Sequence, residues 1–540
     1  MLHVVQWLRV LLSKSTDYFP IEEAAPCLGL ERPLFLYFPR INYPVTLRSQ
    51  LFLALFFSFL LLPYSGQAQP YPKALEVLRL LEKKQGARVT VLLTDLETQT
   101  PILRYRSEES FCPASLMKIP TTGAFLALKG ADYRFQIPIG IRGQLSGDTL
   151  HGQLVLGASG DPSLASHYIE HRGRLVSEIA SLLQRWGIRR VTGGITLDLR
   201  GFPTPSLGEY WPDEDLNEYY GATVSGMNVA DNYADLYLTS STDTLQAEGF
   251  IASLEIPTAT DAFVSTSTQL SLDLTSHEDS LLVSGVVREG LDMRHRRMPF
   301  VDPPLYLGLW LREGLRKQGI EVLTPTTLLR DSLGGAIDTL GVYTSLRADT
   351  LIRITNCRSA NVYAEAMAYV LNDSLQRKSS LPVAVRDYWQ KRLQLPESQF
   401  TPMDGSGLSP HGRLSSQALS LVLLALWEDK ELHAPFLASL PEVGKEGTVR
   451  RLQIHPSITA YMKSGSIRGV RGYAGYVRWK EHWYSLVFMA GGLRDTSEAR
   501  VSFARFVSEL FVAPPPAKYH RGKAAKRGKA KQRTSRRRKR

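Results

Sequence analysis

Three short motifs, and the length of chain between the first two, constrain this sequence more than any other feature. In chain order they are Ser115-x-x-Lys118, Ser359-Ala360-Asn361 and Lys463-Ser464-Gly465. Ser115 and Ser359 are 244 residues apart, far more chain than a single helical lobe requires. If the motifs meet in one site, the chain between them must leave that site and return to it. We therefore expect a discontinuous catalytic domain with other domains inserted after the first motif.

The first motif has the residue types that nucleophilic catalysis needs. A serine hydroxyl is a weak nucleophile unless a base lies beside it, and Lys118 follows Ser115 by one turn of a predicted helix. A second cation nearby would lower the pKa of Lys118, and Lys463 is the candidate for that cation. Backbone N–H groups at the start of the helix can also hold an oxyanion.

The other two motifs offer groups for a substrate and its leaving group. Ser359 has a hydroxyl that can relay a proton to a leaving amine, and the amide of Asn361 can orient a substrate amide. A single S-x-x-K occurs by chance roughly once or twice in a chain of this length. The order and structural context of the three motifs therefore carry the argument.

The predicted elements provide that context. Hydrophobic spacing and turn residues predict helices over residues 72–84, 115–129, 361–371 and 415–426 and a terminal helix bearing Phe503, Phe506 and Leu510. Strands are predicted over residues 88–94, 102–105, 473–479 and 483–490. Between residues 133 and 342 short β-rich stretches alternate with Gly, Asp and Pro, which is typical of β-rich modules.

Taken together, the motifs resemble those of the class C (type-4) penicillin-binding proteins, the D-alanyl-D-alanine carboxypeptidase/endopeptidase family of serine peptidases. Further segments carry this likeness: Gly160-Asp161-Pro162-Ser163-Leu164, Asn361-Val362-Tyr363-Ala364-Glu365, Asp404-Gly405-Ser406-Gly407-Leu408-Ser409, and Ser439-Leu440-Pro441 with Gly447-Thr448. The resemblance covers nearly all of residues 74 to about 492. It implies an α+β fold: a penicillin-binding-protein/β-lactamase-like transpeptidase domain, with an antiparallel sheet and flanking helices, that carries β-rich inserted domains.

The expected domain limits follow from the resemblance and from the change to short β-rich stretches after residue 132. They are an upstream extension and signal peptide (1–68), a discontinuous catalytic domain (69–132 and 343–513), an inserted β-rich domain (133–215 and 287–342), a second nested insertion (216–286) and a disordered basic tail (514–540). A chain of 540 residues is long enough for several such domains. Its 44% hydrophobic and 21% charged residues exclude general disorder and a polytopic membrane protein.

We interpret the chain as a DD-peptidase acting on peptidoglycan stem peptides. Ser115 attacks the carbonyl of the penultimate D-alanine, Lys118 accepts its proton, and Ser359 helps to protonate the departing D-alanine. The backbone N–H groups of Ser115 and Ser466 hold the oxyanion. The terminal carboxylate is expected to bind Lys463, Ser464 and Ser466. β-Lactam antibiotics would then act as covalent inhibitors.

Three further features of the sequence allow two interpretations each. By the resemblance, Asp215 and Tyr220 contact the side-chain amine of the stem peptide, and a solvated acidic loop is the equal alternative. The Asp404-Gly-Ser-Gly segment is an active-site wall or simply a turn. Cys112 and Cys357 flank two of the motifs, and either form a disulfide or remain two buried thiols.

Two positions depart from the family pattern. Ala360 stands where the family usually has aspartate, which removes a supporting carboxylate and affects the local geometry. The third motif has Ser464 in place of threonine, and this residue keeps the hydroxyl. Three cysteines are too few for a zinc site of four thiolates, and no H-E-x-x-H motif occurs. The serine mechanism needs no metal or organic cofactor, so none is expected.

The N-terminal region predicts export. Residues 51–62 read LFLALFFSFLLL, follow Arg48 and precede the small residues Gly66 and Ala68. A short apolar run with these flanks is typical of a signal peptide cleaved after Ala68, whereas a transmembrane helix needs ~20 apolar residues. We therefore expect a periplasmic or otherwise extracytoplasmic protein.

The net charge of +12 lies entirely in the C-terminal tail. Residues 514–540 hold 13 Lys and Arg and no Asp or Glu, which leaves 51 basic and 52 acidic residues in the rest of the chain. In an exported protein such a tail is suited to anionic envelope components, and nucleic acid is disfavoured as a partner. A tail that only aids solubility is the alternative.

Two rival functions stay open from the sequence. A β-lactamase-like hydrolase would use the same mechanism, but the sequence identifies no dedicated deacylating base. A wall-binding scaffold with a weakened active site is the other rival, and Ala360 is the feature that favours it.

Overall fold

The computed structural model describes residues 71–512 except 201, 203–209, 267–270, 278–279, 331–335, 376–378 and 380. The expected signal peptide and basic tail lie outside the described residues and stay predictions. In the part of the chain that is described, every helix is too short or too polar to cross a bilayer.

A five-stranded antiparallel sheet, in the order β2-β1-β22-β21-β20, joins the beginning and the end of the described chain. Its strands are β1 (Arg88–Asp95), β2 (Pro101–Tyr105), β20 (Ile458–Ile467), β21 (Val470–Trp479) and β22 (His482–Gly491). Along β22, Leu486, Phe488 and Ala490 pack into one hydrophobic cluster, whereas Val487 and Met489 pack into another. Side chains of a strand alternate between faces, so this sheet is buried on both sides.

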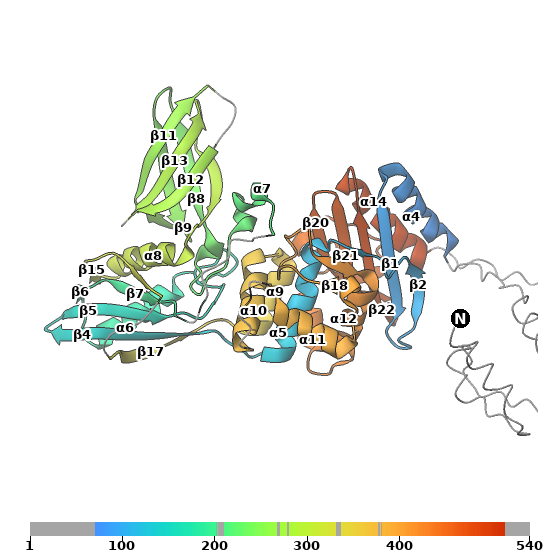
Figure 1. Ribbon diagram of the computed structural model, residues 1–540, viewed down its shortest axis with the longest axis horizontal. Coiled ribbons are helices and arrows are strands. Elements are labelled where there is room, and N and C mark those ends of the chain that lie inside the picture. The colour runs from blue at the N-terminus through green and yellow to red at the C-terminus, as the bar shows by residue number, and fades with distance from the viewer. Residues whose placement is uncertain are drawn as a thin grey trace, which may run out of the picture. The chain divides into compact units, whose positions relative to one another are not determined.

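Two helices cover the first face of this sheet (Figure 1): α4 (Pro72–Gln85) and α14 (Thr496–Phe511). Leu75 and Leu78 of α4 and Phe503 and Phe506 of α14 share a cluster with Phe488. These helices and strands confirm the elements predicted at both ends of the folded chain.

The second face carries a larger group of helices: α5 (Lys118–Lys129), α9 (Ala348–Arg358), α10 (Asn361–Ser374), α11 (Val383–Leu393), α12 (Ser416–Glu428) and α13 (His433–Ser439). Residues 118–126 of α5 are all buried, so this helix is enclosed by its neighbours rather than amphipathic. The first residue of this enclosed helix is Lys118, which places an ionisable group in the interior. The predicted helices at 361 and 415 are confirmed as α10 and α12.

The third motif lies inside a strand, β20, that is absent from the strands predicted from the sequence. β20 includes Lys463 and pairs with β21 along its full length, at the edge of the sheet. The polar run from Lys463 to Ser466 has little strand propensity, so the pairing with β21 determines its conformation.

The chain between the first two motifs forms further sheets. A seven-stranded sheet has the order β15-β6-β5-β4-β17, with β7 paired to both β5 and β16. Its strands are β4 (Gln136–Ser146), β5 (Thr149–Gly157), β6 (Arg190–Val191), β7 (Ile195–Asp198), β15 (Glu321–Val322), β16 (Thr327–Leu329) and β17 (Asp338–Thr344). Two helices that the sequence analysis did not anticipate, α6 (Arg174–Arg185) and α8 (Pro303–Lys317), accompany it.

Two smaller sheets complete this region. One has the order β10-β9-β8-β14 and the other β11-β13-β12. Their strands are β8 (Tyr233–Ser240), β9 (Leu245–Ile251), β10 (Leu254–Ile256), β11 (Thr258–Ser265), β12 (Ser271–His277), β13 (Ser280–Arg288) and β14 (Arg294–Pro299). The domain limits proposed from the sequence stay a prediction.

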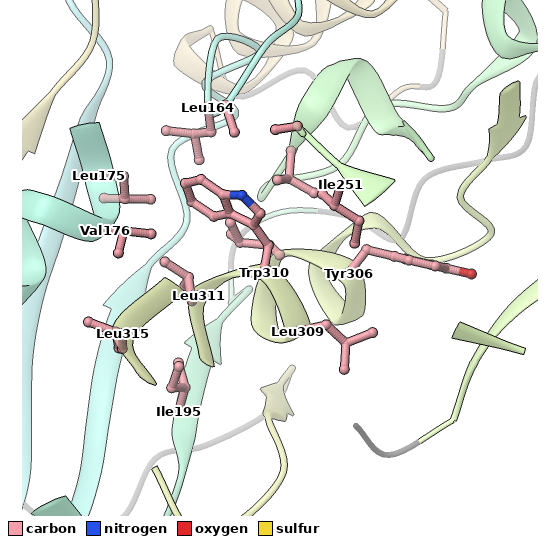
Figure 2. Packing of buried hydrophobic residues seen from close by; sticks show 14 of the residues in the cluster. Leu164, Leu175, Val176, Ile195, Ile251, Tyr306, Leu309, Trp310, Leu311 and Leu315 are labelled. Carbon is pink, nitrogen blue, oxygen red and sulfur yellow. The ribbon is translucent and has the colours of Figure 1, made fainter. Parts of the chain in front are cut away.

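Helix α8 is central to the hydrophobic core of the inserted region (Figure 2). Tyr306 and Trp310 of α8 pack in one cluster with Val176 of α6, Ile195 of β7 and Ile251 of β9. Large aromatic side chains bury much apolar surface, so α8 ties the seven-stranded sheet to the smaller ones.

Candidate active site

The fold brings the three motifs together. Ser115 lies in a short 3₁₀ turn, η1 (Ala114–Met117), that leads directly into α5 and Lys118. Nζ of Lys118 lies 3.1 Å from Oγ of Ser115 and 2.7 Å from Oδ1 of Asn361. Nζ of Lys463 donates a hydrogen bond to Oγ of Ser359 at 2.9 Å. Residues up to 348 positions apart along the chain therefore form one polar site.

Two residues of the site have left-handed backbone conformations. Ala114, just before Ser115, has a φ of 46°, and Ser359 has a φ of 60° at the end of α9. Such conformations are costly for residues other than glycine and occur where the surrounding structure enforces them, often at functional sites. They turn the chain so that both serine hydroxyls face the buried lysines.

Gly465 of the third motif allows β20 to approach η1. A Cβ atom at this position would lie 2.9 Å from the carbonyl oxygen of Pro113 and 3.1 Å from the backbone nitrogen of Leu116. Any side chain would push the strand away from Ser115. The next residue, Ser466, has an exposed side chain at the same edge of the sheet.

Burial controls the ionisation of Lys118, whose surface is fully enclosed. Desolvation lowers its pKa from 10.5 to about 8, although nearby carboxylates oppose this shift. Its amine also lies 2.8 Å from the carbonyl oxygen of Ser406. A neutral amine has two N–H donors for Asn361 and Ser406, and its lone pair then faces the Ser115 hydroxyl. Lys118 is therefore placed to act as a base.

The expectation that Lys463 lowers the pKa of Lys118 is corrected by this arrangement, because burial is the main cause. Instead, Lys118 affects Lys463. Burial, and then the charge of Lys118, hold the pKa of Lys463 well below its usual value. Nζ of Lys463 also donates to the carbonyl oxygen of Ser464 at 2.7 Å.

Glu365, which belongs to the Asn361–Glu365 segment shared with the family, is a positioning residue. Its carboxylate accepts hydrogen bonds from the backbone N–H groups of Gly405 (2.9 Å) and Ser406 (2.7 Å), and so orients the carbonyl that Lys118 contacts. Burial and the charge of Asp404 raise the pKa of Glu365 to about 7. Its position four residues after Asn361, on the same helical face, is the sequence signal that could have identified it.

Asp404 stabilises the turn that forms this wall. Its carboxylate accepts backbone N–H bonds from Gly407 and Ser409, both at 2.6 Å, and the indole N–H of Trp211 at 2.9 Å. The segment is therefore both a turn and a wall of the site, and Trp211 connects it to the inserted region.

Gly407 should tolerate no side chain. Its φ is +81°, and a Cβ atom would lie 1.8 Å from the carbonyl oxygen of Ala114. We expect Gly407→Ala to displace Ser115 and to slow acylation by a penicillin about 100-fold. Rates of labelling and melting temperatures would be compared with those of Gly412→Ala, where the nearest atom to a new Cβ is 3.5 Å away. Equal labelling rates for the two variants would contradict this prediction.

The predicted substrate-binding residues Asp215 and Tyr220 also meet. Asp215 lies in α7 (Asp213–Leu216), and its carboxylate accepts a hydrogen bond from the hydroxyl of Tyr220 at 2.9 Å. The carbonyl oxygen of Tyr220 in turn accepts the amide N–H of Asn361 at 2.7 Å. This loop of the inserted region therefore borders the active site at Asn361.

The structure shows the surroundings of the two residues that depart from the family pattern, Ser464 and Ala360. Oγ of Ser464 donates to Oγ1 of Thr448 at 2.8 Å, so the serine hydroxyl has a partner. Ala360 is the N-cap residue of α10, and no side chain caps this helix. An aspartate there would be a favourable N-cap, which is generally worth about 1 kcal/mol.

Cys112 and Cys357 are free thiols, which resolves the alternatives in favour of no disulfide. Their Sγ atoms lie against different carbonyl oxygens, those of Ser409 (3.6 Å) and Ser439 (3.4 Å). Within the described ranges, no group of three or more His, Cys, Asp or Glu is arranged to hold a metal ion.

Comparisons with known proteins identify the family of this chain. The family model described as the D-Ala-D-Ala carboxypeptidase 3 (S13) family matches residues 74–508. D-alanyl-D-alanine carboxypeptidase DacB of Haemophilus influenzae is 24% identical over 410 residues, which cover 73% of this chain and 83% of that protein. Penicillin-sensitive carboxypeptidase A of Dictyostelium discoideum is 22% identical over 434 residues, which cover 75% and 79% of the two chains.

A solved structure shares the fold. The crystal structure of penicillin binding protein 4 from H. influenzae matches with a TM-score of 0.68 and 21% identity, over 80% of this chain and 99% of that chain. This similarity confirms the expected penicillin-binding-protein fold with its additional β-rich regions.

Proposed function

Because the chain belongs to the D-Ala-D-Ala carboxypeptidase 3 (S13) family and is thus a DD-peptidase, we propose that it is exported and acts through an acyl-enzyme on Ser115. Its substrates would be D-Ala-D-Ala termini and D-alanyl cross-links of peptidoglycan. One observation carries the proposal: the enclosed Lys118 amine lies 3.1 Å from the Ser115 hydroxyl oxygen.

Acylation begins with the neutral Lys118. It takes the proton of Ser115 while Oγ forms a bond to the carbonyl carbon of the penultimate D-alanine. The negative charge that develops on the carbonyl oxygen is held by backbone N–H groups of Ser115 and Ser466. The close approach of β20 to η1 at Gly465 supports this pairing of donors.

Collapse of the tetrahedral intermediate breaks the amide C–N bond. The departing amine receives a proton through Ser359, whose hydroxyl is hydrogen-bonded to Lys463. Lys463, Ser464 and Ser466 bind the terminal carboxylate. Water then attacks the ester on Ser115, and release of the acyl group regenerates the hydroxyl.

On the acyl side, Asp215 and Tyr220 are proposed to contact the side-chain amine of the stem peptide. Their hydrogen bond and the contact of Tyr220 with Asn361 support this assignment. A carboxylate beside a phenol is a suitable partner for an amine.

Incubation with a fluorescent penicillin tests the proposal. A long-lived covalent label is the result expected for a DD-peptidase; rapid turnover would favour a β-lactamase, and no label on a folded protein would favour a scaffold. The relative from H. influenzae has been solved in complex with a β-lactam.

The basic tail, residues 514–540, is proposed to hold the exported enzyme on anionic envelope components. We expect that deleting it leaves penicillin acylation unchanged and weakens salt-sensitive retention on isolated envelopes. Retention would be measured by sedimentation at low and high salt. Unchanged retention of the truncated chain would refute the tethering role.

A further inference from the structure

A cleft of about 840 Å³ adjoins the second and third motifs. Cys357 and Arg358 line it, and they directly precede Ser359 in the chain. Gly447 also lines it and precedes Thr448, the hydrogen-bond partner of Ser464. The cleft is therefore lined by direct chain neighbours of Ser359 and Thr448, on the side where the leaving group and the terminal carboxylate are expected to lie. Asn361 and Tyr220 border the acyl side.

The lining of this cleft is rich in positive charge. Five of its residues are basic and two are acidic: Arg174, Arg353, Arg358, Lys445 and Arg450 against Glu170 and Glu446. Arg174, Arg353 and Lys445 have carboxylate partners. Among the residues that the structure describes, Arg358 and Arg450 take part in no ion pair. Their charges are thus available to an anionic ligand.

The size of the cleft exceeds what a single leaving D-alanine requires. Clefts of roughly 300–1,000 Å³ hold drug-sized ligands, which are larger than one amino acid. In a cross-linked substrate the leaving amine belongs to a second stem peptide, which carries free carboxylates. This peptide would extend from Ser359 into the cleft, where its carboxylates meet unpaired guanidinium groups.

We propose that this cleft is the subsite for the second stem peptide of a cross-link, with Arg358 and Arg450 binding its carboxylates. The inference rests on the proposed function, which already includes D-alanyl cross-links, and adds the part of the molecule that binds the leaving strand. The cleft contributes to binding of the leaving strand and takes no part in acylation itself.

Charge reversal tests the subsite. In R358E/R450E we expect kcat/KM for a purified cross-linked dimer muropeptide to fall about tenfold at low salt, with hydrolysis of an uncross-linked pentapeptide muropeptide changed less than about twofold. The matched control is R451E, which alters the exposed neighbour of Arg450 that does not line the cleft. R358K/R450K should retain most of the dimer activity, and its penicillin acylation should equal that of the wild type.

Binding to a chain carrying Ser115→Ala separates this inference from the proposed function. There we expect R358E/R450E to weaken binding of the dimer about tenfold, while pentapeptide binding stays unchanged. That result supports the cleft even if the wild-type chain hydrolyses neither substrate, an outcome that counts against the proposed function alone. Equal dimer affinity with and without the charge reversal, or a parallel loss for both substrates, overturns the inference.

Discussion

Ser115→Ala is expected to abolish covalent labelling by a penicillin under conditions that fully acylate the wild-type chain. The substitution removes the oxygen that forms the acyl bond and leaves the backbone of η1 in place. Loss of a nucleophile commonly lowers kcat by about 10⁴-fold or more, so DD-carboxypeptidase turnover should fall below detection. Intact-protein mass spectrometry measures the adduct directly, and release of D-alanine measures turnover.

Ser420→Ala is a suitable control for this experiment, because it makes the same change at a buried serine of the same domain. Ser420 lies in α12 and exchanges hydrogen bonds with Thr94 and Ser485, outside the three motifs. Its replacement should lower the melting temperature slightly and leave labelling intact. If the Ser115→Ala chain acquired the penicillin mass at the wild-type rate, the nucleophile would be a residue other than Ser115.

Lys118→Met is expected to slow acylation about 10³-fold, because it removes the general base while keeping a side chain of similar length. The pH profile identifies this role. The pKa of Lys118 is lowered to about 8, so its neutral form is scarce below that pH and predominates above it. Wild-type acylation should therefore rise between about pH 6 and 9, with its midpoint near 8. The variant should lack this rise.

Lys129→Met at the other end of α5 is the matched control and should keep the wild-type rate and profile. The melting temperature of the Lys118 variant is measured alongside, because Oδ1 of Asn361 and the carbonyl oxygen of Ser406 lose this donor. If the acylation rate of Lys118→Met rose with pH at the same midpoint, the titrating group would be another residue, with Lys463 as the first candidate.

Local sequence patterns predicted much of the fold correctly. Leu75 and Leu78, and likewise Phe503 and Phe506, stand at helical spacing. They lie on the buried faces of α4 and α14. The motif residues Ser115 and Asn361 do stand at the beginnings of helical segments. These features depend on neighbours a few residues away, and such periodicity is visible in the sequence.

Other features could not be predicted, because distant contacts determine them. The strand around Lys463 exists because β21 pairs with it, and α8 becomes a core helix because strands from several parts of the chain enclose Trp310. Glu365 of α10 can position the Ser406 carbonyl only because the folded chain places the turn at Ser406 against α10. The cleft beside Arg358 likewise requires segments that are far apart in the sequence.

The sequence by itself determined which chemical groups this protein uses and in what order they occur. Their residue types and spacing indicated a serine nucleophile, a lysine base and an inserted region of 244 residues or fewer between two motifs. The tertiary structure decided how those groups are tuned. Burial brings the pKa of Lys118 to about 8, and a left-handed turn aims Ser359 at Lys463. Desolvation and strain arise only when the surrounding chain closes around these groups, so they have no local signature in the sequence.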